Sequence, residues 1–305
     1  MKRIFWCAAL LLSMVAGTAA ADQPVLRVDY AGSMGAVMDK GLGPAFAKAH
    51  GVTYQGHGQG SYGLARLIAA KQLQADVFVV ITPGPIKIVQ QAGLLGAAQP
   101  VASTQMVIAY SPKSRRAAAF KSAAEGKLKW YTVLEQDGVL FGRTDPSTDP
   151  QGRNIILMMQ LAERYYQQPD LAKTILGPIK NPKQIFSEPS LLSRLEAGQI
   201  DASSGYLSAT ISHHLPYIKL PDEINLSNPA MEPRWYSKAG FELTKPDGKP
   251  EQAKVQPLVF YAGVLKNAEN PKAAQAFVRF LRSDAGQKLF AKFGYSAPKG
   301  DALTP

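Results

Sequence analysis

The chain has 305 residues, of which 46% are hydrophobic, and this length is enough for one large domain or two medium domains. Its only cysteine is Cys7, so intrachain disulfides and cysteine-based metal sites are excluded. The formal net charge of +11 suits an anionic ligand, but no Lys/Arg run with interleaved aromatic residues is present, so nucleic acid is not expected as a partner.

Residues 1–21 have the three parts of a secretory signal peptide. Lys2 and Arg3 precede an apolar run over 4–16, and small residues follow over 17–21. The run is too short to span a bilayer, and the small residues are typical of a signal peptidase site, so we expect cleavage at the end of this segment. The mature protein would then act in the periplasm, as a soluble chain without a thiol.

From residue 22 onward, strand patterns alternate with helix patterns. A loop with Ser33 follows the first strand and opens a helix pattern, and the glycine-rich turn 56–61 places Ser61 at the start of the next helix. Strands that alternate with helices are typical of an α/β fold with a mostly parallel sheet. The strands predicted in this part cover residues 25–30, 52–55 and 75–81.

Two more strand patterns, over 106–110 and 258–264, bracket a middle section that has strand and helix patterns of its own. This spacing predicts two lobes, the first of them discontinuous, joined by two crossing segments that form a hinge. The predicted boundaries are 22–107 plus 262–305 for lobe 1 and 108–261 for lobe 2.

Two later segments have distinct patterns. Residues 273–293 have the periodicity of one long helix, which we expect to pack on lobe 1. Residues 228–254 are rich in Pro, Lys and Gly, and this composition indicates an excursion from the lobe, either a loop or a mobile hairpin.

The most informative stretch is 141–154, Phe-Gly-Arg-Thr-Asp-Pro-Ser-Thr-Asp-Pro-Gln-Gly-Arg-Asn, where an apolar run ends in a turn and a long helix pattern begins. Asp149 is suited to cap this helix, and Gly152 relaxes the backbone. Unpaired N–H groups and the helix dipole at such a turn favour a bound anion. Arg153 opposes the dipole, so it needs an anionic ligand or an ion pair with Asp145 or Asp149.

The turns at Ser33, at Ser61 and at Asp149–Gly152 share one design, because each places small or hydroxyl residues at the start of a helix. In an open α/β sheet such turns lie outside the carboxyl ends of the strands, where ligands bind. Either serine alone could be a helix cap. The three turns together favour an anion held between two lobes by hydrogen bonds.

Other chemistries find less support in the sequence. The turn 58–63 lacks the Gly-Lys-Ser/Thr ending of a nucleotide-binding loop. No Gly-x-Ser-x-Gly elbow is present, and an extracytoplasmic hydrolase that uses Asp149 or a serine would need a base that we cannot name. His213 and His214 have no third His or Cys nearby, so no metal site and no cofactor are predicted.

Three segments, 141–154, 188–201 and 218–227, together resemble the molybdate/tungstate-binding proteins of ABC importers. The string Leu-Pro-Asp-Glu-Ile-Asn-Leu-Ser in the third segment is the most specific match, and the likeness covers most of the mature chain but weakens over 228–254. The resemblance implies a two-lobed type II periplasmic-binding fold that closes on a tetrahedral oxyanion and presents it to a membrane permease. We expect such a protein to act as a monomer and to perform no bond chemistry.

The resemblance also assigns residues to the site. Ser33 and Ser61 match the oxyanion donors of the first lobe, Asp149 matches the carboxylate of the second-lobe turn, and Tyr206 matches the tyrosine of the hinge-side segment. The predicted ligand-binding set is therefore Ser33, Ser61, Asp149, Gly152, Arg153 and Tyr206.

This chain departs from one branch of the family at three of its positions. Gly205 stands where that branch has a glutamate that completes an expanded coordination of the central metal, and Gln151 and Arg153 replace Cys and Tyr. The loss of a carboxylate and the gain of an arginine favour ordinary hydrogen bonding to an anion. Tetrahedral molybdate or tungstate is the expected ligand, and sulfate or a small organic acid is the alternative.

Overall fold

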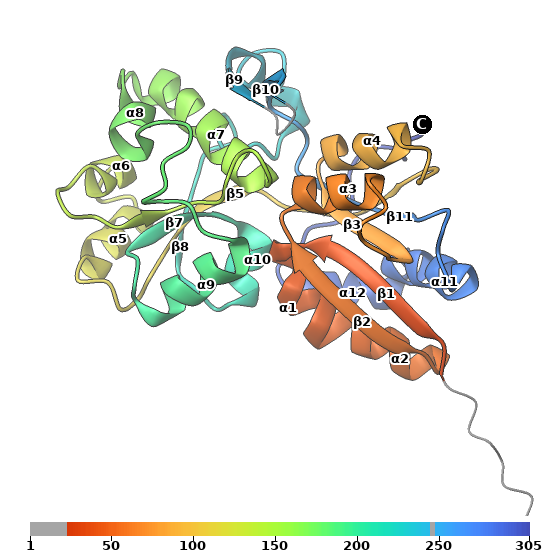
Figure 1. Ribbon diagram of the computed structural model, residues 1–305. Coiled ribbons are helices and arrows are strands. Elements are labelled where there is room, and N and C mark those ends of the chain that lie inside the picture. Colours follow the sequence, from red (N-terminus) through yellow and green to blue (C-terminus); the bar gives the residue numbers. More distant parts are fainter. Residues whose placement is uncertain (1–22, 245–247) are drawn as a thin grey trace, which may run out of the picture.

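The computed structural model describes residues 23–244 and 248–305, so the predicted signal peptide over 1–21 lies outside the described residues. Two lobes lie side by side, each with its own β-sheet and covering helices (Figure 1). The chain leaves the first sheet after β4 (Gln99–Ser103) and returns to it at β11 (Val259–Val264), which gives two crossing segments. Within the described ranges, no helix is long and apolar enough to cross a membrane.

The first lobe is built on a five-stranded sheet with the order β2-β1-β3-β11-β4. β1 pairs in parallel with β2 and β3, whereas β11 pairs antiparallel with β3 and β4. The apolar sequence of β3, Val-Phe-Val-Val-Ile, is buried along its whole length, as expected for a strand covered on both faces. The three remaining strands are β1 (Val25–Ala31), β2 (Thr53–Gln59) and β3 (Val77–Ile81).

Helices cover both faces of this sheet (Figure 1). On one face, Leu64 of α3 and Val89 of α4 pack with Phe78 in one apolar cluster. On the other face, the rings of Phe46 in α2 and Phe277 in α11 meet edge to face, with centroids 5.0 Å apart. The helical segments of this lobe are η1 (Gly32–Met34), α1 (Gly35–Val37), η2 (Met38–Leu42), α2 (Gly43–His50), α3 (Ser61–Ala69), α4 (Pro83–Gln91), α11 (Pro271–Arg282) and α12 (Asp284–Lys292).

The second lobe has a four-stranded sheet with the order β6-β7-β5-β8, in which only the β6–β7 pair is parallel. Its strands are β5 (Met106–Tyr110), β6 (Phe141–Gly142), β7 (Ala202–Tyr206) and β8 (Tyr217–Lys219). Its helices are α5 (Ala117–Ala124), α6 (Trp130–Leu134), α7 (Pro150–Tyr166), α8 (Leu171–Leu176), α9 (Glu188–Ala197) and α10 (Leu207–Ser212).

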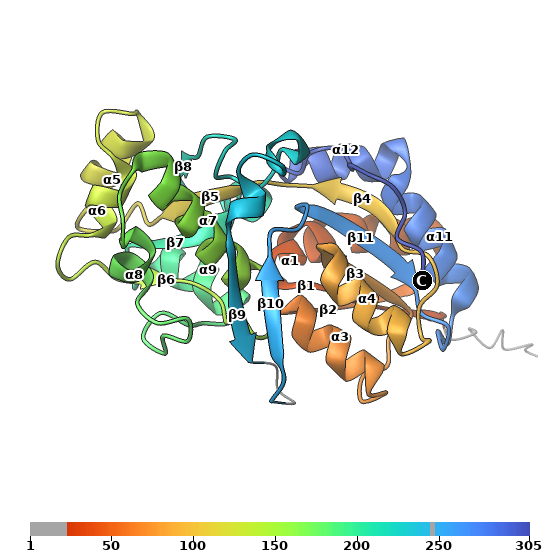
Figure 2. The same ribbon diagram turned by 90° about the horizontal axis from the view of Figure 1, so that it is seen from above.

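The segment 228–254 contains an antiparallel hairpin, one of the two alternatives that its composition left open. Figure 2 shows this hairpin lying across the junction of the two lobes. The Gly240 N–H donates to Gln160 Oε1 of α7 at 2.9 Å, which attaches the hairpin to the second lobe. Its elements are η3 (Pro229–Met231), η4 (Tyr236–Lys238), β9 (Gly240–Thr244) and β10 (Pro250–Lys254).

The predicted α/β class is confirmed, and in each sheet all strands but one run in the same direction. In the first sheet β11 runs antiparallel to both of its neighbours, and in the second sheet β5 does the same. Both strands adjoin the crossing segments. Because β11 enters its sheet from the other lobe and not through a helical crossover, its direction is not tied to that of its neighbours.

The single helix predicted over 273–293 is in fact two helices, α11 and α12, which meet at Ser283. Ser283 has an extended backbone with ψ of 162°, and its Oγ accepts a hydrogen bond from the Gly286 N–H at 3.3 Å. A serine at this position is a typical helix N-cap. The apolar periodicity continues through both helices, so the period alone did not reveal the break.

The turn predicted over 56–61 also begins later than expected, because β2 extends through Gln59. A Cβ on Gly56 or Gly58 would lie 2.9 or 2.6 Å from the Tyr30 ring of the neighbouring strand β1. The two glycines therefore allow the edge strand to lie against this ring, and they serve strand packing rather than a turn.

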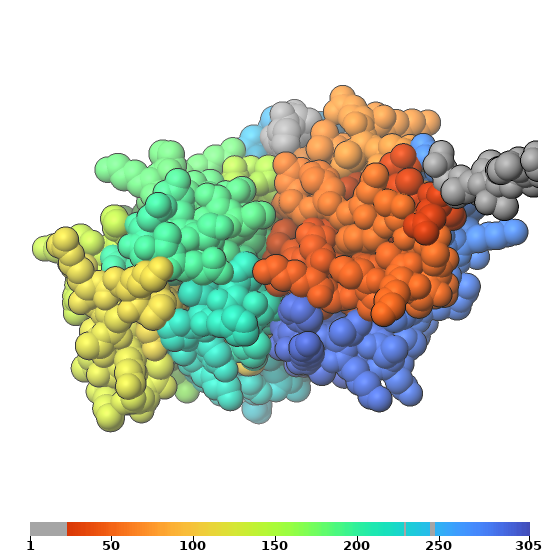
Figure 3. All heavy atoms as spheres, turned by 90° about the horizontal axis from the view of Figure 1, so that it is seen from below, coloured from red at the N-terminus to blue at the C-terminus, as the bar shows by residue number. Residues whose placement is uncertain are grey.

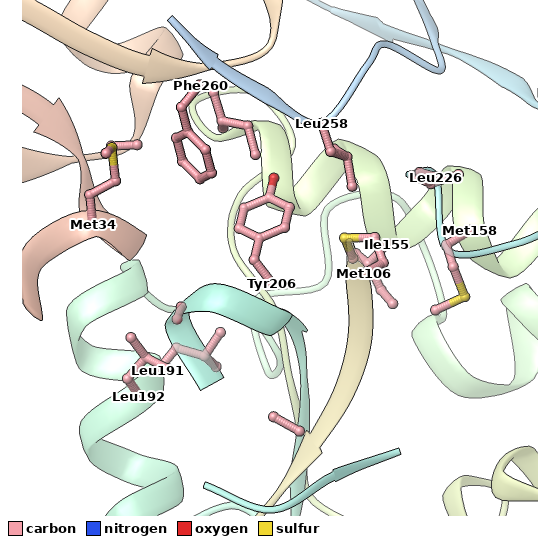
Figure 4. Close-up of a cluster of buried hydrophobic side chains, with 14 of the residues drawn as sticks. Met34, Met106, Ile155, Met158, Leu191, Leu192, Tyr206, Leu226, Leu258 and Phe260 are labelled. Carbon is pink, nitrogen blue, oxygen red and sulfur yellow. The ribbon is translucent and has the colours of Figure 1, made fainter. Parts of the chain in front are cut away.

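The apolar core continues across the junction of the lobes. Met34 of η1 and Phe260 of β11 belong to the same buried cluster as Leu191 and Tyr206 of the second lobe. Figure 4 shows the Tyr206 hydroxyl pointing toward the segment that carries Leu258 and Phe260. The lobes thus lie against each other, and Figure 3 shows their surfaces in contact. The lobe boundaries at 107/108 and 261/262 stay a prediction.

Candidate functional site

The turn over 144–152 leads into α7 and is fixed by its own side chains. Asp149 caps the helix, with Oδ1 accepting a hydrogen bond from the Gln151 N–H at 2.8 Å. Asp145 Oδ1 accepts from both the N–H and the hydroxyl of Ser147, at 2.8 and 2.6 Å. A Cβ on Gly152 would lie 2.4 Å from the Thr144 carbonyl oxygen, so only glycine lets this turn fold back onto the helix.

The start of α3 in the first lobe meets this turn of the second lobe. The Tyr62 and Gly63 N–H groups donate to the Thr148 carbonyl oxygen at 2.9 and 3.0 Å. A Cβ on Gly60 would lie 2.9 Å from that oxygen and 3.2 Å from Asp149 Oδ2. The structure therefore brings the turns at Ser61 and Asp149 together, with the lobes closed on each other.

Neither predicted serine is a helix cap. Ser61 is the first residue of α3, whose N-cap is Gly60, and no side chain caps that helix. Ser33 lies inside η1, whose N-cap is Ala31, again without a side-chain hydrogen bond. Both serines are 1% exposed, and the Ser33 hydroxyl lies near the Glu188 carboxyl without a hydrogen bond of good geometry to any described residue. A buried hydroxyl without a partner is available to a ligand.

Glu188 is a member of the site that sequence reasoning missed. It is the first residue of α9, it is 3% exposed, and its Oε1 accepts a hydrogen bond from Gln151 Nε2 at 3.1 Å. A Cβ on Gly32 would lie 3.2 Å from Glu188 Oε2, so the carboxylate borders the Ser33 turn of the first lobe. In the sequence, an acidic residue in the first turn of a helix indicates nothing beyond a favourable dipole interaction.

Gln151 organises the middle of the site. Its backbone holds Asp149, its Nε2 holds Glu188, and its Oε1 accepts a hydrogen bond from the Ser204 hydroxyl at 3.1 Å. Gln151 is 1% exposed, so all of these hydrogen bonds lie out of water. Gln151 therefore links the turn before α7 to α9 and to β7. The glutamine at this position has a structural role in the site.

Tyr206 lies at the end of β7 and is fully buried. Its hydroxyl oxygen accepts a hydrogen bond from Asn154 Nδ2 at 3.0 Å, so its own hydrogen is left to donate. Burial, together with the charges of Asp149 and Glu188, raises the pKa of this hydroxyl well above its ordinary value. Tyr206 therefore stays protonated and can act as a donor to an anion.

The two carboxyl groups are perturbed in the same direction. Burial raises the pKa of Asp149 to about 6, although the hydrogen bond from the Gln151 N–H opposes the rise. Burial, and after it the charge of Asp149, raises the pKa of Glu188 well above its ordinary value. Each carboxyl is thus easier to protonate than a carboxyl in water.

Arg153 points away from this cluster. Its guanidinium forms a bidentate ion pair with Glu251 of β10, with N–O distances of 2.7 and 3.0 Å, and it lies 3.7 Å above the Tyr62 ring. Its Nε donates to the Pro146 carbonyl oxygen at 2.8 Å. The ion-pair partner is therefore Glu251, and not Asp145 or Asp149 as the sequence suggested.

A cavity of about 860 Å³ opens beside the site, between the two lobes. Asp149 and Glu188 are among its lining residues, and Arg66 and His57 stand at its first-lobe side. Ser33, Ser61 and Tyr206 are almost fully buried and do not line it. In the parts of the chain that are described, no group of three or more His, Cys, Asp or Glu residues is placed to hold a metal ion.

Comparison with known proteins shows a match to solute-binding proteins. A family model described as "Bacterial extracellular solute-binding protein" matches residues 26–296. The molybdate/tungstate-binding protein WtpA of Pyrococcus abyssi is 30% identical over 259 residues, which are 78% of this chain and 73% of that protein. WtpA of Thermococcus kodakarensis is 34% identical over 62% of this chain, and a solute-binding protein of Petrotoga mobilis is 32% identical over 63%. The match covers only 57% of the Thermococcus protein and 59% of the Petrotoga protein.

Solved structures share the architecture. The periplasmic molybdate-binding protein of Azotobacter vinelandii has a TM-score of 0.63 at 14% identity, with 90% of this chain and 100% of that chain covered. The periplasmic binding protein AfuA of Actinobacillus pleuropneumoniae has a TM-score of 0.57 at 16% identity, with 90% and 85% covered. At such identities the likeness concerns the fold alone, and it confirms the predicted two-lobed type II periplasmic-binding fold.

Proposed function

Because this chain belongs to the bacterial extracellular solute-binding protein family, we propose that it captures a tetrahedral oxyanion, molybdate or tungstate, between its lobes. It then presents this anion to the membrane permease of an ABC transporter. The names of the relatives from Pyrococcus and Thermococcus support the choice of ligand. The protein binds and releases its ligand without making or breaking covalent bonds, and it works in the periplasm as a monomer.

One observation carries the proposal. Hydroxyl donors from both lobes, Ser33 and Ser61 on one side and Tyr206 on the other, are buried around the junction where the Asp149 turn meets α3. A dry site with fixed hydroxyl and amide donors binds an oxyanion through hydrogen bonds that are stronger there than in water. Gly152 contributes by letting the turn pack closely, and Arg153 by holding the turn to Glu251.

Closure of the lobes is the step that a permease would recognise. The hydrogen bonds from the Tyr62 and Gly63 N–H groups to the Thr148 carbonyl oxygen join the lobes in the arrangement described, and opening of the lobes would break them. A ligand that binds the closed form better than an open form shifts the population toward closure by its difference in affinity. The ligand would thus contact both lobes at once and stabilise the closed form.

A different anion, such as sulfate or a small organic acid, is the second candidate, and Gly205 favours it. A Cβ at this position would lie 2.9 Å from Thr210 Oγ1, so the local packing leaves no room for the larger glutamate side chain of the related branch. An expanded metal coordination through this position is therefore not expected. Binding would rest on hydrogen bonds to oxygen atoms, which many oxyanions offer.

Calorimetric titration of the ligand-stripped mature protein with molybdate, tungstate and sulfate tests the proposal. We expect tight binding of molybdate and tungstate at one site per chain and weaker binding of sulfate. Preference for sulfate or for an organic acid would support the second candidate. If none of these anions binds, oxyanion capture is wrong for this chain.

A further inference from the structure

Two buried carboxyl groups share one side chain in the site. Gln151 donates its backbone N–H to Asp149 Oδ1 and its Nε2 hydrogen to Glu188 Oε1, at 2.8 and 3.1 Å. Asp149 and Glu188 are 5% and 3% exposed, and neither forms an ion pair with any described residue. We call these two residues the carboxyl pair.

The surroundings of the carboxyl pair do not neutralise it. Arg153 carries the positive charge on the same helix, but it is paired with Glu251, and Arg66 donates to the Ser147 carbonyl oxygen. The titratable groups around the pair are Asp145 of the turn, Arg153 of α7, Tyr206 of β7 and Tyr295 near the C-terminus. Arg66 of α3 and His57 of β2 line the same cavity as the pair. Neither Arg153 nor Arg66 forms an ion pair with Asp149 or Glu188.

An oxyanion cannot approach two ionised carboxylates in a dry site without strong repulsion. A carboxyl that takes up a proton loses its charge and gains an O–H donor. Glu188 Oε1 accepts from Gln151, and Oε2 borders the Gly32–Ser33 turn, where the N–H and hydroxyl of Ser33 also interact with the carboxyl. We place the proton on Oε2, where it must outweigh these two interactions, which favour the ionised form. There the new O–H lies beside the Ser33 hydroxyl, where a ligand oxygen would be received.

We propose that this site takes up one proton from solvent together with its oxyanion, and that Glu188 carries this proton within the carboxyl pair. The inference rests on the proposed function, because it concerns the same anion site. In the open form both carboxyls face water and are ionised at neutral pH, whereas closure on the anion transfers a proton to Glu188. The raised pKa values of both carboxyls in the closed structure agree with this direction.

The pH dependence of the anion affinity follows from whether the complex or the free protein binds the proton more tightly. A group that binds a proton more tightly in the complex than in the free protein makes the complex stronger as pH falls. Affinity should therefore decrease as pH rises from 6 to 8, by up to about tenfold per pH unit if one proton is taken up. Replacement of Glu188 by a residue that does not ionise should remove this change of affinity with pH.

The experiment is calorimetric titration with molybdate and with sulfate at pH 6, 7 and 8, each in two buffers of different ionisation enthalpy. The difference between the buffers gives the number of protons taken up. For the wild-type protein we expect about one proton per anion within this range. For Glu188→Gln, whose amide imitates the protonated acid, we expect no uptake and a Kd at pH 8 at least about tenfold below that of the wild type.

Glu196→Gln is the matched control, because Glu196 lies on the same helix, is largely exposed and pairs with His213 away from the site. It should keep the proton uptake of the wild type. Asp149→Asn, which keeps a helix-capping side chain, serves as a second variant and should also reduce the uptake. A purely structural role of Glu188 would instead make Glu188→Gln bind more weakly at every pH.

The outcomes separate the two proposals. Tight anion binding with no proton uptake overturns the proton linkage and leaves the proposed function standing. Full uptake in Glu188→Gln overturns the assignment to Glu188. Absence of binding at every pH overturns the proposed function and the linkage with it.

Discussion

At the scale of single residues, Ser33 and Ser61 are buried but do not cap the helices in which they lie. Ser61 makes no capping bond at the start of α3, and Ser33 has an unpaired hydroxyl. Buried polar groups without partners are rare in folded proteins because they cost free energy. A ligand that accepts a hydrogen bond from Ser33 would reduce this cost on binding.

The Ser61→Ala substitution should therefore weaken oxyanion binding by about 1–3 kcal/mol and leave the free energy of unfolding almost unchanged. The reason is that the hydroxyl is needed by the ligand and not by the helix. Titration calorimetry and a denaturant melt would measure the two quantities. An unchanged affinity would remove Ser61 from the site, and a large loss of stability would restore the capping interpretation.

At the residue scale, the sequence offered a motif for the Asp149 turn and none for Glu188. The turn with Asp149 has a recognisable order of Asp, Pro and Gly, and the structure places this residue at the lobe junction. Glu188 reaches the site from α9 only because the tertiary fold brings α9 to the Ser33 turn. The partner of Arg153 was missed for the same reason, since Glu251 lies 98 positions away.

At the scale of elements, Arg153 connects three segments that are distant in sequence. It pairs with Glu251 of the hairpin, covers the Tyr62 ring of α3 and donates to the turn before α7. Its side chain is 6% exposed, so loss of its partner would leave a nearly buried cation unpaired. The hairpin β9–β10 is therefore attached to the junction of the lobes and not only to α7.

Glu251→Ala should destabilise this attachment by about 1.5–3 kcal/mol, the usual value for hydrogen bonds to a charged group. Hydrogen exchange of β9 and β10, residues 240–244 and 250–254, should become faster, while the preference among anions stays the same. Glu242→Ala, an exposed position on the neighbouring strand β9, is the matched control and should change neither. A changed anion preference in Glu251→Ala would instead indicate that Arg153 turns to the ligand.

The limits of prediction for elements have physical causes. Strand and helix types followed from periodicity, because the apolar face of β1, β3 or α3 must be buried whatever its neighbours are. The direction of β11 and the break at Ser283 depended on how distant segments meet. Glycines of β2 resembled a turn in the sequence, although in the structure they make room for the Tyr30 ring.

At the scale of the whole molecule, the proposed function depends on the approach of the two lobes. Gly60 lies at a backbone contact between them, where an added Cβ would lie 2.9 Å from the Thr148 carbonyl oxygen. That oxygen belongs to the backbone of a turn that is packed tightly around Gly152, so it cannot move aside easily. Gly60 is thus a point where the closed form is sensitive to a single methyl group.

Gly60→Ala should prevent full closure and raise the Kd for the oxyanion at least about tenfold, or about 1.4 kcal/mol. The unliganded lobes should remain folded, because the clash arises between the lobes and not within α3. Gly63→Ala on the same helix is the matched control, since its added Cβ would lie 4.0 Å from the nearest atom, Thr148 Cβ, in ordinary contact. Small-angle scattering should show ligand-induced compaction in wild type and Gly63→Ala but not in Gly60→Ala. Compaction and wild-type affinity in Gly60→Ala would mean that ligand capture does not use the closed arrangement described above.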